Sequence, residues 1–251
     1  MAILTGLVGV VAAAWIYLAV VVPRTMHISM TVHAMQSMVR VRPWTAGEFA
    51  LRVLMWAVMM IAMMVPTATP MTLVYAAIAR KATAQGTPVT PTFVFVAGYV
   101  AMWSLFAVAA TGAQRVLDHL ALLSPTIVSR SPLLGGVLLV AAGVYQLTPY
   151  KRACLANCRS PAHFIAQHWR SGVVGAFRMG LEHGAYCLGC CWILMGLLFV
   201  GGVMNLLWVA AIALFVLVEK TIPFGETGAR LAGAVMIAIG ALSLAGLVTL
   251  G

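Results

Sequence analysis

The segment from Val173 to Val200 reads VVGAFRMGLEHGAYCLGCCWILMGLLFV, and it decides the kind of fold that we expect. A helix of this length is long enough to cross the hydrocarbon core of a bilayer, which is about 30 Å thick. The strands of a membrane barrel would instead show alternating segments of about ten residues. The segment therefore predicts a membrane-spanning helix.

The composition of the whole chain agrees with this prediction. Apolar residues make up 63% of the 251 residues and charged residues 8%, whereas soluble domains are about 45–50% apolar and about 25% charged. These few charged side chains cannot form a water-facing shell around such an apolar chain. Lipid must therefore be its main solvent. We expect an all-α fold, a polytopic membrane helix bundle that forms a single integral membrane domain over residues 1–251.

Seven apolar segments predict about seven transmembrane helices. They are Ala2–Val22, Glu48–Arg80, Thr92–Gln114, Pro132–Pro149, Val173–Val200, Met204–Val218 and Ala229–Leu250. The first has no preceding basic region and no Ala-x-Ala exit, so we interpret it as a retained span rather than a cleaved signal peptide. Pro66 and Pro70 are expected to kink the second helix. Small residues such as Gly233 predict close packing of the last helix.

The charged residues predict a lipid bilayer, and not nucleic acid, as the partner of this surface. Fifteen Lys and Arg residues stand against five Asp and Glu residues, which gives a formal net charge of +10. The basic residues lie mainly between the apolar segments, where they meet lipid phosphates and set the topology. More of them fall on the side of the N-terminus, which predicts that the N-terminus is cytoplasmic.

Nitrogen and sulfur donors recur every four residues on the quoted segment. The stripe consists of Met179, His183, Cys187, Cys191 and Met195. Residues four apart share one face of a helix, and thiolate, thioether and imidazole are ligands that suit copper(I) and zinc. Cys190 and Glu182 lie beside the stripe, and an ionisable residue at membrane depth is a functional candidate. The alternative is that these Cys and Met residues are ordinary buried hydrophobes.

A second cysteine pair, Cys154 and Cys158, follows the fourth apolar segment with the same spacing of four. The pair is a candidate metal clamp, redox dithiol or disulfide, and spacing alone does not choose between these. We interpret the nearby His163 and His168 as interfacial residues. The two clusters are too far apart along straight helices to share one metal. We therefore predict that glycines break the fifth segment near residues 173–180, which brings His183 and Cys187 toward Cys154 or Cys158.

Methionine is concentrated in two further places. The stretch Met26–Met38 contains four Met and two His residues and is either a collector of soft metal or an interfacial helix. The second segment carries several Met residues, including Met63, which either line a path for copper(I) or fill a kinked helix. At the end of the sixth segment, we interpret Lys220 as a snorkelling residue and Glu219 as a candidate proton acceptor or counter-ion.

With these residues assembled, the chain resembles a bacterial family of predicted metal-binding integral membrane proteins of unknown function. The shared residues run from Trp56 to Gly225. They include Ala62-Met63-Met64, Tyr145-Gln146, Cys154-Leu155, Cys187 through Trp192, and Glu219-Lys220. The resemblance implies a multi-span fold with a metal site, in the cytoplasmic (inner) membrane of a bacterium.

We therefore predict a copper(I)-binding membrane protein that handles, transports or delivers the metal through Cys, Met and His ligands. Zinc is the second choice of metal. Only five acidic residues argue against a carrier of manganese, magnesium or calcium, because those ions need oxygen ligands. The alternative is a membrane redox protein, either a cysteine dithiol relay or a metal-dependent oxidoreductase subunit in a larger complex. A third possibility is a packing subunit without chemistry. A membrane or periplasmic protein is the expected recipient of the metal.

Overall fold

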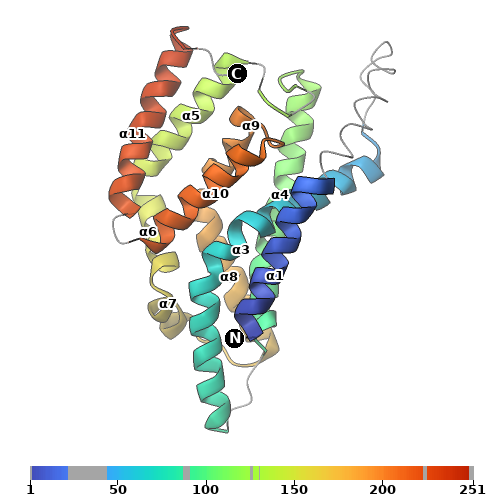
Figure 1. The fold of residues 1–251 in the computed structure, drawn as a ribbon. Coiled ribbons are helices and arrows are strands. Elements are labelled where there is room, and N and C mark those ends of the chain that lie inside the picture. Colours follow the sequence, from blue (N-terminus) through green and yellow to red (C-terminus); the bar gives the residue numbers. More distant parts are fainter. Residues whose placement is uncertain are drawn as a thin grey trace.

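The computed structural model describes residues 2–21, 44–86, 91–124, 127–129, 131–222 and 225–248. Within these ranges the chain is all-α, as expected, and its only β-type pairing is an isolated bridge between Leu123 and Ser129. The Met26–Met38 stretch lies outside the described residues. The helices are α1 (Ala2–Ile16), η1 (Tyr17–Val21), α3 (Ala46–Ala84), α4 (Thr92–His119), α5 (Pro132–Leu147), α6 (Pro149–Arg159), α7 (Pro161–His168), α8 (Gly172–Gly196), α9 (Leu198–Gly201), α10 (Leu206–Thr221) and α11 (Gly225–Leu244) (Figure 1).

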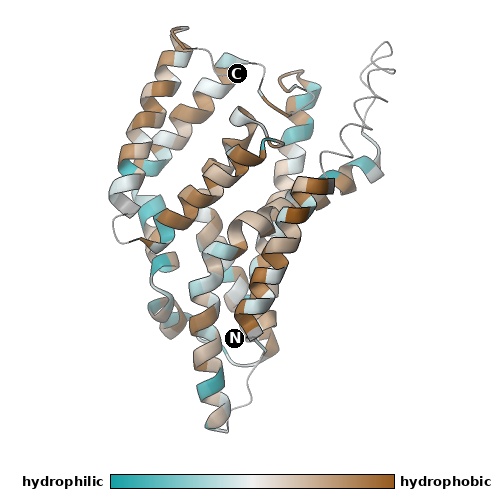
Figure 2. Cartoon of the chain, viewed as in Figure 1, coloured by the Kyte–Doolittle hydropathy of each residue, from teal (hydrophilic) through white to brown (hydrophobic). Residues whose placement is uncertain are grey.

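Five of the described helices are long and apolar enough to cross a membrane, or up to six if the bent pair α5–α6 counts as one span. The expectation of about seven spans is therefore not confirmed. The Met204–Val218 segment forms α10, whose 16 residues give a length of only about 24 Å. Apolar residues predominate along α1, α10 and α11, whereas hydrophilic residues are more frequent along α6 and α7 (Figure 2). The long apolar helices are compatible with insertion into a membrane.

Helix α3 contains both expected prolines and continues through them to Ala84. Pro66 has no amide hydrogen, so the carbonyl oxygen of Ala62 loses its usual partner one turn later. The indole nitrogen of Trp15 in α1 donates to that oxygen at 3.2 Å. A side chain of α1 thus bonds to the backbone oxygen that Pro66 leaves free. Figure 1 shows that α3 changes direction along its length.

The predicted glycine break in the fifth segment is wrong. Helix α8 runs without interruption from Gly172 to Gly196. Gly180 of α8 serves close packing instead, because a Cβ atom added there would lie 2.0 Å from the carbonyl oxygen of Phe95 in α4. On the facing helix, a Cβ atom added at Gly98 would lie 2.1 Å from the carbonyl oxygen of Phe177. Because neither position has room for a side chain, α4 and α8 approach each other closely.

The sharp bend lies between α5 and α6, which meet at 65°. A residue that precedes proline avoids the helical conformation, and Thr148, before Pro149, is extended with φ −72° and ψ 148°. The Thr148 side chain then caps α6 by accepting a hydrogen bond from the Lys151 amide at 3.3 Å. The bend directs α6 against α8, so a break does bring the two cysteine clusters together, but it lies in the fourth segment.

Helices α5 and α11 form a closely packed pair at one side of the bundle (Figure 1). A Cβ atom at Gly143 would lie 2.5 Å from the carbonyl oxygen of Gly233, and one at Gly240 would lie 2.8 Å from that of Gly136. The predicted packing role of Gly233 is thus confirmed. Since α5 carries α6 at its end, this pair supports the element that brings Cys154 and Cys158 to α8.

Candidate metal centre

The donor stripe on α8 is buried along its whole length. Met179, His183, Cys187, Cys191 and Met195 are each at most 2% exposed, and Cys190 is fully buried. A spacing of four keeps these side chains on one face, and that face is directed into the bundle because α4, α6 and α10 cover it. Trp192, on the opposite side of the helix, is 46% exposed.

Helix α6 brings the second cysteine pair to this face. Helix α6 packs against α8, and the half-buried Cys158 lies against the buried cluster that contains Cys187, Cys190 and Cys191, near enough to interact with the thiols of Cys187 and Cys190. We call these four residues (Cys158, Cys187, Cys190 and Cys191) the thiol cluster. The proximity expected between the two sequence clusters is therefore present.

Cys154 sits one helical turn before Cys158 and packs on the backbone of α8. A Cβ atom added at Gly189 would lie 2.8 Å from the Cys154 sulfur. Gly189 therefore leaves the space that Cys154 occupies, and the hydroxyl of Tyr145 donates to the Gly189 carbonyl oxygen beside it. All five cysteines are free thiols.

Lys220, at the end of α10, reaches into the thiol cluster. Its ammonium nitrogen lies 2.7 Å from the Cys187 sulfur and 3.3 Å from the hydroxyl oxygen of Thr67, and the residue is 7% exposed. The prediction that Lys220 snorkels away is wrong. An ammonium group next to a thiol favours the thiolate, which is the form that binds metal.

Tyr99 of α4 closes the other side of Cys187. Its hydroxyl oxygen is 3.0 Å from the Cys187 sulfur and donates to the carbonyl oxygen of Met64 at 2.9 Å. The carbonyl of Met64 also accepts a hydrogen bond from Thr67 at 2.8 Å. The kinked part of α3, α4 and α10 thus all contribute polar groups around one thiol of α8.

A second buried charge pair lies behind Lys220. Lys151 of α6 and Glu219 of α10 form an ion pair with a nitrogen–oxygen distance of 2.6 Å, and both side chains are at most 2% exposed. Lys151 also donates to the side-chain oxygen of Gln146. Glu219 therefore balances Lys151, and the charge of Lys220 faces the thiols. Glu219 is thus a counter-ion, one of the two roles expected for it, and its partner is Lys151.

His183 lies in an aromatic enclosure next to the thiol cluster. Its ring stacks on Tyr99 and Phe95 at centroid distances of 5.5 and 6.1 Å and meets the edge of Phe164 at 5.4 Å. Its Nδ1 atom is buried and has no hydrogen-bond partner among the described residues. A buried nitrogen without a partner is uncommon and is consistent with a role as ligand.

Two candidates lie outside the thiol cluster. The Glu182 carboxylate is paired with Arg170 at 3.0 Å and Arg178 at 3.4 Å, and its side chain is 24% exposed. The Met179 sulfur accepts a hydrogen bond from the backbone amide of Arg170 at 3.3 Å. Glu182 and Met179, both candidate ligands from the sequence, thus contact Arg170 rather than the thiol cluster. His168 packs on Phe164, at a centroid distance of 4.4 Å.

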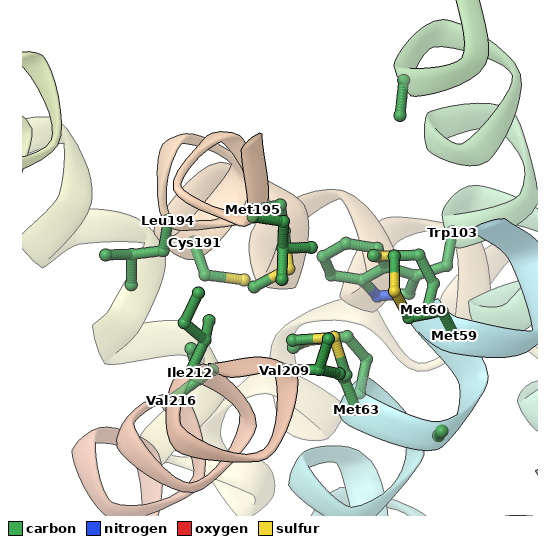
Figure 3. Close-up of a cluster of buried hydrophobic side chains, with 14 of the residues drawn as sticks. Met59, Met60, Met63, Trp103, Cys191, Leu194, Met195, Val209, Ile212 and Val216 are labelled. Carbon is green, nitrogen blue, oxygen red and sulfur yellow. The ribbon is translucent and has the colours of Figure 1, made fainter. Parts of the chain in front are cut away.

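Met63 and Met195 lie on the other side of the cluster, deeper in the bundle. Figure 3 shows Met59, Met60 and Met63 of α3 in one buried cluster with Cys191 and Met195 of α8. Met63 and Met195 are each 1% exposed. Thioethers therefore continue the series of sulfur atoms from the thiol cluster along the core.

The donor set suits a soft metal, but its present arrangement is closed. In the described part of the chain, no three His, Cys, Asp or Glu side chains form a ready-made ligand group. The thiols of Cys190 and Cys191 each donate to the carbonyl oxygen of Cys187 at 3.0 Å, and the Lys220 ammonium occupies the space at Cys187. Metal binding would require side-chain rotation of these thiols and withdrawal of Lys220.

Sequence reasoning missed the polar groups that surround Cys187. Tyr99, Thr67 and Lys220 come from three other helices, and Lys220 is 33 residues away from Cys187 along the chain. The one available signal was that a Lys and a Glu stand together at the end of an apolar segment, where each is expensive to bury. Nothing in the local pattern around Tyr99 distinguishes it from other tyrosines.

One comparison with known proteins gives a match. A family model described as PpoB2, copper chaperone, matches residues 53–243, which include every residue of the thiol cluster and Lys220. This match supports the metal-related part of the resemblance seen in the sequence, and the description of the family names copper. Searches of curated proteins and of solved structures gave no match.

Proposed function

Because the chain belongs to the PpoB2 copper chaperone family, we propose that it is an integral membrane protein that holds copper(I) in the thiol cluster and delivers it to a partner protein. Copper is the cargo of this protein. Cys158, Cys187, Cys190 and Cys191 are the proposed principal ligands, with His183 and the thioethers of Met63 and Met195 on either side. Their soft donors suit copper(I), whereas the few oxygen ligands disfavour harder ions.

The observation that carries this proposal is that a half-buried thiol of α6 lies against three buried thiols of α8. Cys158 comes from α6 and the other three from α8, and their contacts depend on the bend at Thr148. One straight helix cannot surround a metal, because all its ligands point outward from one side. Ligands from a second helix remove that obstacle, and zinc remains the second choice of metal on the same grounds.

Lys220 gives the proposed site a copper-free state that is stable in a nonpolar surrounding. A buried thiolate without a partner is costly, and the ammonium group supplies the opposite charge. Copper(I) also carries one positive charge. Exchange of the ammonium for the metal at the Cys187 thiolate therefore leaves the charge of the buried site unchanged as long as the other thiols keep their protons. A chaperone must release its cargo, and an internal cation that can return to the thiolate favours release.

The redox alternative rests on the same contacts. Cys158 touches Cys187 and Cys190, so oxidation could join it to either of them. Trapping thiols with an alkylating agent in cells separates the two functions. A redox relay predicts that Cys158 alternates between the thiol and a disulfide. Copper binding predicts that the cysteines stay reduced and that only bound metal protects them from alkylation.

The direct test is metal analysis of the full-length protein purified in detergent after reduction and loading with copper(I). We expect stoichiometric copper in the wild-type protein and strong loss in Cys190→Ser and Cys191→Ser. These positions are chosen because neither thiol contacts Lys220 directly in the hydrogen-bond network. Met71→Leu, in a separate buried cluster, is the control. Traces of copper that none of the substitutions changes would exclude the proposal.

A further inference from the structure

A small cavity opens beside α3 at the far end of α10 from Lys220. Three methionines line it, Met55 and Met59 from α3 and Met204 from the turn before α10. The rest of its lining consists of Leu and Val side chains, and no charged residue is among the lining residues. Met59 is buried, whereas Met55 and Met204 are half-buried. The lining therefore combines one methionine of the buried core with two that are partly exposed.

This cavity is separate from the thiol cluster. Leu206, at the start of α10, lines it, and Lys220, near the end of the same helix, contacts Cys187. The rise along the helix between these residues is roughly 20 Å. A single metal ion cannot bind at both ends, because metal–sulfur bonds are only about 2.3 Å long.

Thioethers occupy the core between the two places. Met59 belongs both to the cavity lining and to the buried cluster that contains Met63, Met195 and Cys191 (Figure 3). Sulfur atoms are thus present at the cavity, in the middle of the core and at the thiol cluster. Ordinary hydrophobic packing explains buried Met residues singly, but it does not explain why half-buried ones line a cavity at the end of this series.

We propose that the cavity is a second copper(I) site, formed by the thioethers of Met55, Met59 and Met204, at which the metal enters or leaves the protein. The inference rests on the proposed function, since it supplies the thiol cluster with its cargo. Thioethers are neutral and need no deprotonation, so they bind soft monovalent ions and reject hard, strongly hydrated ones. A weak site of this kind suits transient binding.

Movement between the sites is a series of ligand exchanges. Copper stays in the +1 state throughout, and no oxidant or reductant is needed. Each bond from copper to one sulfur breaks as the bond to the next sulfur forms, in the order Met59, Met63, Met195 and then a thiol of the cluster. A thiol that is neutral before the metal arrives releases its proton to solvent when it binds as the thiolate. The thioether steps release no proton.

The experiment uses the full-length protein in detergent and silver(I), a redox-inert substitute for copper(I). The first variant carries Met55→Leu, Met59→Leu and Met204→Leu. The matched control carries Met71→Leu, Met102→Leu and Met236→Leu, which likewise replaces one buried and two half-buried methionines. We expect the cavity variant to bind one silver ion fewer than the control and to load its thiol cluster more slowly. Equal silver content and equal loading rates in the two variants would overturn the inference.

A second pair of proteins distinguishes failure of the cavity site from failure of the proposed function. Both carry Cys158→Ser, Cys187→Ser, Cys190→Ser and Cys191→Ser, together with Lys220→Leu so that the lysine is not left without its thiol. We expect this background to retain one weakly bound silver ion, which the three cavity substitutions abolish. A background that binds no silver contradicts the cavity site. Cysteine substitutions that change nothing, with a silver ion that depends on Met55, contradict the thiol cluster and leave the cavity site in place.

Discussion

The ammonium nitrogen of Lys220 lies 2.7 Å from the sulfur of Cys187, at the point where α3, α4 and α10 meet α8. Both residues are buried. A cation at this position has two consequences for the proposed copper(I) site. It favours the thiolate that such a metal requires, and it occupies the place proposed for the metal. The same contact therefore prepares the site and keeps it closed.

The first prediction is that Lys220 and Cys187 depend on each other for stability. Cys187→Ala leaves the lysine charge buried without its partner, which should lower the free energy of unfolding by about 3–5 kcal/mol. Lys220→Met removes the charge and keeps an apolar chain of similar length, so it should cost much less. The double variant should be more stable than Cys187→Ala alone.

Denaturant unfolding of the copper-free protein in detergent measures this cycle. The deciding quantity is the coupling energy between the two substitutions. If their effects on the free energy of unfolding simply add, the contact between Lys220 and Cys187 contributes nothing to stability. Lys220→Arg is a useful control, since it keeps the charge but cannot place a compact ammonium group against the sulfur.

The second prediction concerns the docking of α6 on α8. An alanine at Gly189 would place its Cβ 2.8 Å from the Cys154 sulfur, so Gly189→Ala should displace the Cys154 side chain, loosen the packing of α6 on α8 and destabilise the protein by about 1–3 kcal/mol. Since α6 carries Cys158, copper binding should fall as well.

Gly196→Ala on the same helix is the matched control. Its Cβ would meet no atom closer than 3.9 Å, so the substitution should be neutral or stabilise the helix by roughly 0.5–1 kcal/mol. Thermal unfolding and copper content are measured for both variants. Equal behaviour of the two alanines would contradict the tight contact at Gly189.

The third prediction separates Glu182 from the thiol cluster. Its carboxylate is paired with Arg170 and Arg178, both of which are exposed. Partly exposed ion pairs contribute little, so Glu182→Gln should change the free energy of unfolding by no more than about 1 kcal/mol. Copper content should stay at the wild-type level, in contrast to Cys190→Ser. A loss of copper in Glu182→Gln would return this residue to the set of ligands.

Much of the α8 face could be predicted from sequence because helical periodicity is a local property. The spacing of four from Met179 to Met195 places those side chains on one side, and burial follows because the opposite side carries the residues that tolerate exposure. The contact between the two cysteine clusters rests on a separate argument: ligands from two places in the chain can bind one metal only if they lie close together.

The remaining features depend on contacts between distant residues. The glycines of α8 predict a break in that helix, but Gly180 and Gly184 are instead sites of close packing on α4. The bend follows instead from Pro149, whose effect on Thr148 is local but whose consequence is a tertiary contact. Likewise, a lysine at a helix end is as compatible with snorkelling as with pairing to a thiol, and only the neighbouring helices decide between these.

The last prediction tests how α1 supports the kinked part of α3. Pro66 leaves the Ala62 carbonyl oxygen without an amide donor, and Trp15 supplies the hydrogen bond at 3.2 Å. Trp15→Phe should therefore leave a partly buried acceptor unpaired and cost about 1–3 kcal/mol. In a protein that also carries Pro66→Ala, the restored amide at residue 66 is able to bond to that oxygen, so the same Trp15 substitution should cost less.

Because Thr67 and Met64 lie next to Pro66 and contact Lys220 and Tyr99, Pro66→Ala should also reduce copper content. Unfolding of the four proteins in detergent gives the coupling, and a cost of Trp15→Phe that is the same with and without Pro66 would show that the indole does not act through the proline.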